Sequence, residues 1–366
     1  MSIDPALAGW LQLTLSPGLG NATIRELLQK FGLPDNILSM KRPALAAIAG
    51  DEAVRALDAP SVMQAVERAL AWLELPGHSL VTLADAGYPR LLLEIGDPPP
   101  VLYCDGRAEL LNRPCLAVVG SRNASSQGAS NAEQFSRALS AAGLTIVSGL
   151  AQGIDAAAHR GGLAGEGSTI AVLGTGVDLR YPRSNAGLAD EIAERGLLLS
   201  EFPLGASALA HHFPRRNRLI SGLAQGCLVV EAALASGSLI TARAAAEQGR
   251  EVFALPGSIH SPLSKGCHAL IKQGAKLAES AEDVLSELAA FRRTGFASTQ
   301  ATREAVAPSS DGDEPLLACM GFDPVDVDSL CARARLPAEK VSAELLRLEL
   351  AGRISALPGG LYQRLN

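Results

Sequence analysis

The sequence lacks the features that mark several common classes of protein. It has no apolar run near the roughly 20 residues that a membrane-spanning helix needs. Its first residues, MSIDPALAGW, show no basic segment followed by an apolar one, so a secretory signal is not expected. The six cysteines are scattered, with no CxxC pair and no disulfide-like spacing. These absences predict a cytoplasmic protein that makes no contact with a membrane.

Motifs for cofactors and catalysis are missing as well. The first apolar run is followed by GSRNASSQG in place of GxGxxG, and no acidic residue follows the second run where a ribose hydroxyl would need it. Neither GxxxxGK[ST] nor GxSxG occurs. His211 and His212 are adjacent, which does not suit two ligands of one metal ion. We therefore expect no cofactor, no metal and no enzymatic activity.

Arginines form an unusual cluster in an otherwise mildly acidic chain. The formal net charge is −6 over 366 residues, which argues against a general nucleic-acid binder but leaves room for a local basic site. Within FPRRNRLISG, Arg215, Arg216 and Arg218 occur without an intervening carboxylate. Such a run is typical either of a solvated helix face or of a site for anions.

Length and composition, with 48% hydrophobic and 19% charged residues, indicate two or three globular domains. Residues 1–80 are expected to be helical, and SPGLGN between two helices is typical of a helix-hairpin-helix or SAM-like domain, although a plain helical turn fits the same residues. Residues 294–314 are rich in Ser, Thr, Ala and acids and are predicted to be a linker. Residues 315–366 follow the outline of a winged helix, whose presumed recognition helix has nearly balanced charges, so it suits contact with a protein as well as with DNA.

Residues 81–293 alternate short apolar runs with helical patterns. The runs are CLAVVG, LTIVSG, STIAVLG, LLLSE, CLVVEA, EVFALPG and AKLAES. Apolar strands that alternate with helices indicate an α/β fold with a doubly wound, parallel, Rossmann-like sheet. Ligands of such sheets bind beyond the carboxyl ends of the strands.

The segments that follow these strands are rich in glycine, hydroxyls and arginine. Glycine lets backbone amides approach a ligand, and guanidinium groups suit phosphates. A row of arginines suits a phosphodiester chain better than a single nucleotide, and with aromatic residues at only 4% the binding should depend on phosphate contacts and on salt. The candidate DNA-binding residues are Gly120, Ser121, Arg122, Ser148, Gly149, Gly153, Gly176, Arg183, Phe213, Arg216, Asn217, Arg218, Ser236, Gly237, Ser238, Thr241 and Lys265.

Two alternatives stay open at this point. His159, Asp155, Glu201 and Glu231 are the side chains best placed to act as acids or bases, although His159 fits a structural role equally well. Ser238 can bind phosphate or can cap the helix that follows it.

The ordered series VVGSR, IVSGLAQGIDAAAH, GTGVDLRYPRSN, FPRRNRLISGL and ASGSLITARAAAEQG resembles the DNA-processing protein A (DprA/Smf) family. The resemblance covers roughly residues 80–290. It implies a non-enzymatic protein that binds single-stranded DNA during natural transformation, protects the strand and helps to load a RecA-type recombinase past single-strand-binding protein, usually as a homodimer. It also implies that Arg122, Arg183, Arg216, Asn217 and Arg218 contact DNA, while Arg215 occupies a variable position.

The closest alternative to this family is a class of enzymes that contain a similar sheet. Phosphoribohydrolase-like enzymes carry a PGGxGTxxE-like loop in which the glutamate does the chemistry. Here the corresponding stretch is EAALASGSLITARAAAE, in which no acid directly follows the glycine and Glu247 lies far along the expected helix.

Overall fold

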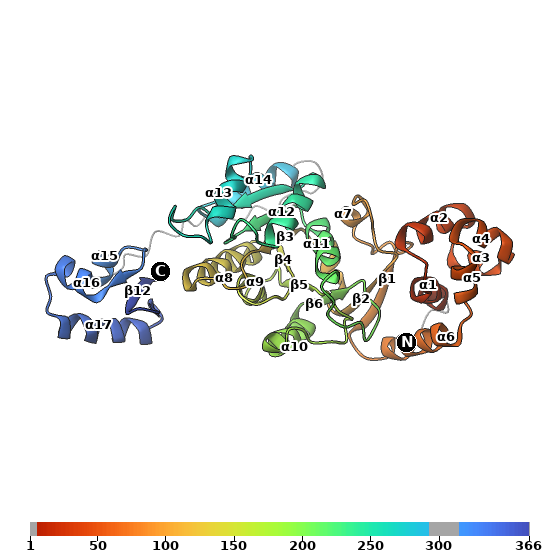
Figure 1. The fold of residues 1–366 in the computed structure, drawn as a ribbon, viewed down its shortest axis with the longest axis horizontal. Helices are drawn as coiled ribbons and strands as arrows, with labels where there is room; N and C mark the ends of the chain where they lie inside the picture. The colour runs from red at the N-terminus through yellow and green to blue at the C-terminus, as the bar shows by residue number, and fades with distance from the viewer. Residues whose placement is uncertain (1–5, 293–314, 366) are drawn as a thin grey trace.

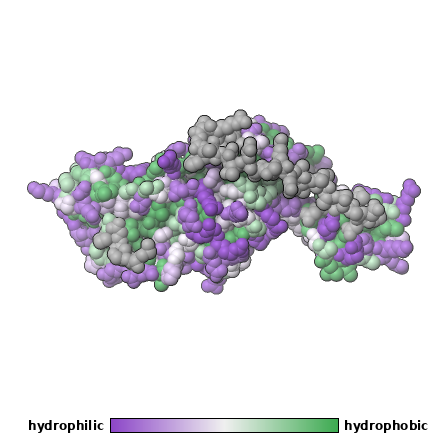
Figure 2. Space-filling view, turned by 180° about the vertical axis from the view of Figure 1, so that it is seen from behind, coloured by the Kyte–Doolittle hydropathy of each residue, from purple (hydrophilic) through white to green (hydrophobic). Residues whose placement is uncertain are grey.

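The computed structural model describes residues 6–292 and 315–365. Three parts lie in a row, with the N-terminal helices at one end, a large sheet in the middle and a small helix-and-strand domain at the other end (Figure 1). Hydrophilic and hydrophobic side chains are interspersed on the face seen in Figure 2. Within the described ranges, no helix is long and apolar enough to cross a membrane.

Six helices form the N-terminal part. Leu13, Ile24, Leu27 and Leu45 are among the side chains that bury their apolar faces against one another. Gly18, in the turn between the first two helices, has a φ of 84°, a conformation that glycine adopts without strain. The helices are α1 (Ala6–Leu15), α2 (Asn21–Phe31), α3 (Pro34–Ser39), α4 (Arg42–Ala49), α5 (Asp51–Ala56) and α6 (Pro60–Leu73).

The central sheet has nine strands in the order β1-β2-β6-β5-β4-β3-β7-β8-β9. All seven predicted strands are present as β3 to β9, and they are parallel to one another. The strands are β1 (His78–Thr82), β2 (Val101–Gly106), β3 (Cys115–Val119), β4 (Thr145–Ser148), β5 (Thr169–Val172), β6 (Leu197–Ser200), β7 (Gly226–Val229), β8 (Glu251–Ala254) and β9 (Lys276–Leu277).

Two strands that the sequence analysis did not predict extend the sheet at one edge. β1 pairs with β2, and β2 with β6, both in antiparallel fashion, so the sheet is mixed and not wholly parallel. Pro98, Pro99 and Pro100 precede β2, and such a proline cluster is typical of a loop and not of a strand. The apolar run VLYC, buried throughout, was the signal that could have revealed β2.

Helices cover both faces of the sheet, which confirms the doubly wound arrangement. Those on one face are α7 (Arg90–Leu93), α11 (His212–Leu223), α12 (Ser238–Glu247) and α13 (Lys265–Lys272). Those on the other are α8 (Ser126–Ala141), α9 (Ile154–Leu163), α10 (Ala186–Arg195) and α14 (Ala281–Arg292). Two short 3₁₀ helices, η1 (Ala108–Asn112) and η2 (Arg183–Asn185), lie in connections.

The strand order reverses next to β3. From β3 the chain proceeds to β4, β5 and β6 on one side, and β7, β8 and β9 then follow on its other side. The segments that leave β3 and β7 therefore diverge and open a crevice at the carboxyl ends of these strands, where ligands of such sheets bind.

The C-terminal part confirms the winged-helix prediction. Its sheet has the order β10-β12-β11, and Gly359 and Gly360, both at positive φ, form the turn of the hairpin. The elements are α15 (Pro315–Met320), β10 (Val325–Asp326), α16 (Val327–Ala334), α17 (Ala338–Leu350), β11 (Ile354–Leu357) and β12 (Leu361–Arg364). The predicted linker at 294–314 lies outside the described residues, and the domain boundaries stay predictions.

Candidate functional site

A pocket of about 370 Å³ lies at the crevice where the strand order reverses. We call it the first pocket. Its walls come from the segments after β3, β4 and β7 and from one face of α11. The residues that line it are Val119, Gly120, Ser121, Arg122, Asn123, Ala151, Asp155, Phe213, Arg216, Asn217, Ile220, Ala233, Ser236, Gly237, Ser238 and Thr241.

Arg216 forms the base of the first pocket. It is only 4% exposed, and its guanidinium group donates hydrogen bonds to Gly149 O at 2.6 Å and to Val172 O. Asp155, also buried, accepts from the backbone amides of Gly149 and Ala151 at 3.2 and 3.3 Å. Burial lowers the pKa of Arg216 to about 10, and the charge of Asp155 opposes this shift. The guanidinium group therefore stays positive at neutral pH.

Phe213 brings the two arginines of the first pocket together. The guanidinium carbons of Arg122 and Arg216 lie 5.8 and 5.9 Å from the centre of its ring, within the range of cation–π attraction. Arg122 is exposed at the mouth of the pocket, whereas Arg216 lies at its base. An aromatic face and two positive charges therefore point into one crevice.

Arg183 lies at the same edge of the sheet but outside the lining of the first pocket. It is exposed on η2, which is fixed to the segment after β4 because Asn185 Nδ2 donates to Leu150 O and Ala151 O. Next to Arg183, the ring of Tyr181 lies 6.0 Å from that of Phe213. The structure thus places Arg183 within the neighbourhood that the sequence predicted for it.

Glycines let this backbone pack closely. A Cβ at Gly149 would lie 2.6 Å from the Arg216 guanidinium group. Gly153 has a φ of 74°, and a Cβ there would lie 2.3 Å from Ser121 O. Both glycines pack against residues that line the first pocket, and neither glycine lines it.

The segment after β7 contributes hydroxyl groups. Ser236 Oγ and Ser238 Oγ lie 2.6 Å apart, and Ser236 Oγ also accepts from Ser238 N at 3.3 Å. Ser238 is the first residue of α12, and Gly237 holds the capping position without a side-chain bond. Of the two roles considered for Ser238, the cap therefore does not apply, and Ser238 and Thr241 are both among the residues that line the first pocket.

Besides Gly149, Gly153 and Arg183, three more predicted residues lie outside the lining of the first pocket. Ser148 is buried and donates to Val118 O at 2.6 Å, which makes it part of the sheet. Gly176 donates its amide hydrogen to Ala206 O in the connection after β5. Lys265 is exposed at the start of α13, where its Nζ donates to Ile259 O.

Arg218 corrects the expectation of one continuous row of arginines. Successive residues of an α-helix are about 100° apart, so Arg218 lies about 200° around α11 from Arg216. Its guanidinium group contacts Glu201, whose side chain is 1% exposed, and Asp97, whose Oδ2 lies 3.5 Å away. Arg218 therefore points away from the first pocket.

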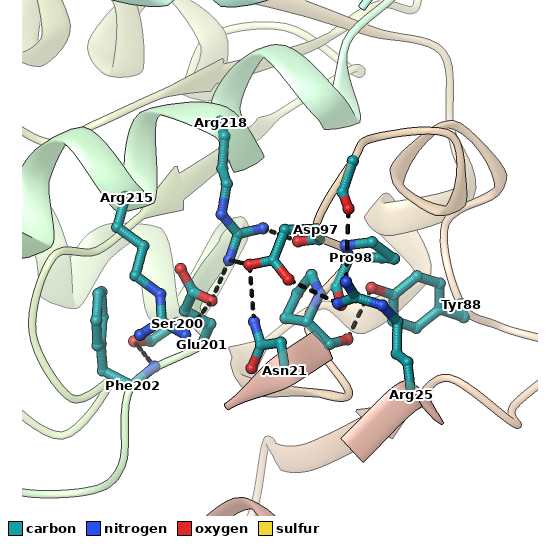
Figure 3. A network of polar contacts seen from close by, with 12 residues as sticks. Asn21, Arg25, Tyr88, Asp97, Pro98, Ser200, Glu201, Phe202, Arg215 and Arg218 are labelled. Carbon is teal, nitrogen blue, oxygen red and sulfur yellow. Dashed lines mark hydrogen bonds and ion pairs between the residues drawn. The ribbon is translucent and has the colours of Figure 1, made fainter. Parts of the chain in front are cut away.

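Asp97 connects this part of α11 to the N-terminal helices (Figure 3). Arg25 Nη1 donates to Asp97 Oδ1 at 2.6 Å, and Asn21 Nδ2 donates to Asp97 Oδ2 at 3.2 Å. Although burial alone would raise the pKa of Asp97, these hydrogen bonds and the charge of Arg218 bring it below its ordinary value. The first turn of α2 is thus fixed to the segment that precedes β2.

Two of the candidate acids and bases have structural partners. His159 is fully buried; its Nε2 accepts from Leu150 N at 3.2 Å, so Nδ1 carries the proton and donates to Thr169 Oγ1 at 2.7 Å. Burial lowers the pKa of His159 to about 3. Glu231 accepts from Ser125 N and Oγ at 2.9 and 2.5 Å, at the start of α8.

Sequence reasoning missed several residues that line the first pocket. Asn123 and Ala151 were not chosen, although each lies in a segment that had been identified. Asp155 was considered only as a catalytic acid. The spacing of Phe213, Arg216, Asn217 and Ile220, at i, i+3, i+4 and i+7, was the signal for one helix face.

Comparison with known proteins shows the family to which the chain belongs. The family model for DNA recombination-mediator protein A matches residues 79–289, which is more than half of the chain. The chain belongs to the DprA/Smf family. The model of the DprA winged helix domain matches residues 300–360.

Individual members of the family show how much of the chain is similar to known proteins. Protein Smf of Escherichia coli is 47% identical over 309 residues, which cover 82% of this chain and 81% of the relative. DNA processing protein DprA of Streptococcus pneumoniae is 52% identical over 206 residues, covering 56% and 73%. The X-ray structure of that DprA aligns with a TM-score of 0.65 at 42% identity, over 78% of this chain and 99% of the other.

A second solved structure concerns the mode of single-stranded DNA binding by DNA processing protein A of Helicobacter pylori. It aligns with a TM-score of 0.53 at 30% identity, over 58% of this chain and 97% of the other.

Proposed function

We propose that the chain binds single-stranded DNA through backbone phosphates at the first pocket. The observation that carries the proposal is the convergence of Arg122 and Arg216 on the ring of Phe213 at the reversal of the strand order. Guanidinium groups bind phosphate with charge-assisted hydrogen bonds, and an aromatic face offers a base a surface for stacking. The Helicobacter relative, whose solved structure concerns single-stranded DNA binding, supports the same ligand.

The shape of the site favours a flexible chain over a duplex. Arg216 lies at the base of a crevice whose walls are the segments after β3 and β7. A single strand can bend its phosphates into such a crevice, whereas the phosphates of a duplex follow a stiff helix. Arg183, outside the crevice on the same edge, extends the positive surface along the path of a polymer.

The wider role follows from family membership. We infer that the bound strand is DNA taken up during natural transformation, that binding protects it, and that the protein helps a RecA-type recombinase to replace single-strand-binding protein. By the same inference, the protein forms a homodimer.

A non-enzymatic role is supported by His159 and Glu231, because their side-chain nitrogen and oxygen atoms form hydrogen bonds within the fold. The phosphoribohydrolase-like alternative predicts that ribose phosphate is released from a nucleoside monophosphate, which chromatography detects.

Replacement of Arg122 or of Arg183 by Ala tests the proposal. We expect each variant to bind an oligothymidine about 1–3 kcal/mol more weakly, because each removes charge-assisted contacts to phosphate. Fluorescence anisotropy measures the affinity. Arg137→Ala is the matched control, since Arg137 is exposed on α8, pairs with Glu133 and lies outside the first pocket. If Arg122→Ala and Arg183→Ala both bind as tightly as this control, the DNA site lies elsewhere.

A further inference from the structure

The ring of Tyr181 is exposed at the same edge of the sheet as the first pocket. Tyr181 is 47% exposed, and Phe322, in the C-terminal part, is the only other Phe, Tyr or Trp of the described residues that is exposed. A single exposed ring is ordinary on a protein surface, so the role of Tyr181 depends on what lies beside it.

The neighbours of Tyr181 belong to the proposed DNA site. Its ring lies 6.0 Å from the ring of Phe213, which lines the first pocket, and the exposed Arg183 follows two residues later. The guanidinium carbon of Arg122 lies 5.8 Å from the centre of the Phe213 ring. Aromatic rings beside a row of positive charges are the combination by which proteins hold single strands without reading their sequence.

Of the two neighbouring rings, that of Tyr181 has the larger free surface. Phe213 is half-buried, and the backbone of Gly174 lies so close to its ring that a Cβ at Gly174 would lie 3.0 Å from Phe213 Cδ1. The guanidinium groups of Arg122 and Arg216 also lie against the Phe213 ring. Tyr181 therefore offers more room for a flat partner than Phe213 does.

The chain on either side of Tyr181 is fixed to the fold. The preceding Arg180 donates from its Nη2 to Asp105 Oδ2 at 3.1 Å. On the other side, Asn185 Nδ2 donates to the carbonyl oxygen of Ala151 at 3.2 Å, and Ala151 lines the first pocket. A surface that is held in place before binding loses little conformational freedom when a ligand arrives. The ring of Tyr181 is therefore presented at a fixed place beside the pocket.

The chemistry of the exposed ring suits a base and not a phosphate. The face of an aromatic ring carries partial negative charge, so it does not attract an anion. Every nucleobase has a flat face that can stack on such a ring, whichever base it is. A strand whose phosphates reach both Arg122 and Arg183 would have to pass Tyr181, because Tyr181 adjoins Phe213 on one side and η2 on the other.

We propose that Tyr181 is a stacking surface for one base of the strand that the first pocket holds by its phosphates. This inference rests on the proposed function. It adds to the phosphate contacts one contact that needs a base but no particular base, and that does not depend on the release of counterions.

Oligothymidine and an abasic strand of equal length, which keeps the deoxyribose phosphate chain but has no bases, test the inference by fluorescence anisotropy. Tyr181→Ala should bind oligothymidine about 5- to 150-fold more weakly, the equivalent of about 1–3 kcal/mol for one stacked base. The same variant should bind the abasic strand as tightly as the unaltered protein does. Tyr181→Phe keeps the ring and should bind both strands normally.

Phe322→Ala is the matched control, because it removes the other exposed ring, in the C-terminal part. Both of its affinities should be unchanged, and thermal unfolding checks that all variants are folded. An unchanged affinity of Tyr181→Ala for oligothymidine would overturn the inference. An equal loss for both strands would also overturn it, since Tyr181 would then act only by holding η2. A loss in Tyr181→Phe as large as in Tyr181→Ala would assign the effect to the hydroxyl group and not to stacking.

The abasic strand also separates this inference from the proposed function. Its affinity in Arg122→Ala and Arg183→Ala reports on phosphate contacts alone, while the ratio of oligothymidine to abasic affinities in Tyr181→Ala reports on stacking. Arg183→Ala should reduce the slope of the salt dependence by about 0.7, whereas Tyr181→Ala should leave this slope unchanged. A reduced slope in Tyr181→Ala would show that the variant has lost a phosphate contact, which would overturn the stacking role and leave the phosphate site intact.

Discussion

At the scale of single residues, the two arginines that share the Phe213 ring are held in different ways. Arg122 is exposed and can follow a strand as it moves, whereas Arg216 is buried and fixed by backbone oxygens. A fixed donor loses little conformational freedom on binding, while a mobile one loses more. We therefore expect Arg216 to define where a phosphate sits, and Arg122 to close over it.

His159 provides a prediction for stability at this scale. In the folded protein its pKa is about 3, while the unfolded chain takes up the proton at the ordinary value of 6.5. The folded state is therefore favoured above pH 6.5, and this contribution is lost as the pH falls from 6.5 toward 3. Between about pH 7 and pH 5 the loss amounts to about 2 kcal/mol of the free energy of unfolding.

Urea unfolding at these two pH values measures the effect, with His159→Gln as the comparison. Gln keeps a donor and an acceptor but does not titrate, so the variant should lose about 2 kcal/mol less than the unaltered protein over this interval. Equal losses in both proteins would show that His159 takes up a proton as readily in the folded state as in the unfolded one.

At the scale of elements, the start of α8 connects two walls of the first pocket. Ser125 Oγ accepts from Gly128 N at 2.9 Å, a helix cap. Glu231, from the segment after β7, in turn accepts from Ser125. The cap of one helix therefore also fixes the distance between the segments after β3 and β7.

Ser125→Ala should lower the free energy of unfolding by about 0.5–2 kcal/mol, the usual cost of losing such a cap. Ser130→Ala, on the same helix but away from the cap, should change it by less than about 0.5 kcal/mol. Urea denaturation compares the two variants. A Ser125→Ala protein as stable as Ser130→Ala would mean that the α8 amides find other partners.

The sequence revealed the strands far better than the orientation of the arginines. Buried parallel strands such as β3 and β7 are continuous apolar runs, and this signal is local. Whether Arg218 faces the first pocket depends on the helical state of FPRRNR and on Asp97, which is distant in sequence. The short edge strand β1 has no pattern of its own, because its pairing with β2 decides its conformation.

At the scale of the whole molecule, the net charge of −6 and the proposed DNA site coexist because positive charge is local. Arg122 and Arg183 are exposed at one edge of the sheet, with Arg216 between the segments that carry them. The rest of the acidic surface repels a polyanion. A strand should therefore be directed to this edge.

Affinity for oligothymidine should fall with salt. If Arg122, Arg183 and Arg216 each neutralise one phosphate, the logarithm of the association constant should fall with the logarithm of salt concentration with a slope of about −2, from about −0.7 for each contact with a single strand. Arg122→Ala should reduce the slope by about 0.7. Anisotropy titrations at several salt concentrations measure both slopes. A slope near zero would indicate binding by stacking.

The contacts of Asp97 make the N-terminal helices and α11 interdependent. Asn21 and Arg25 on one side and Arg218 on the other share this carboxylate, and Arg218 in turn neutralises the buried Glu201. A hybrid that exchanged the first helices for those of a relative would therefore have to carry compatible partners for Asp97. Without them, the misfit would reach the helix whose opposite face carries Arg216 at the base of the first pocket.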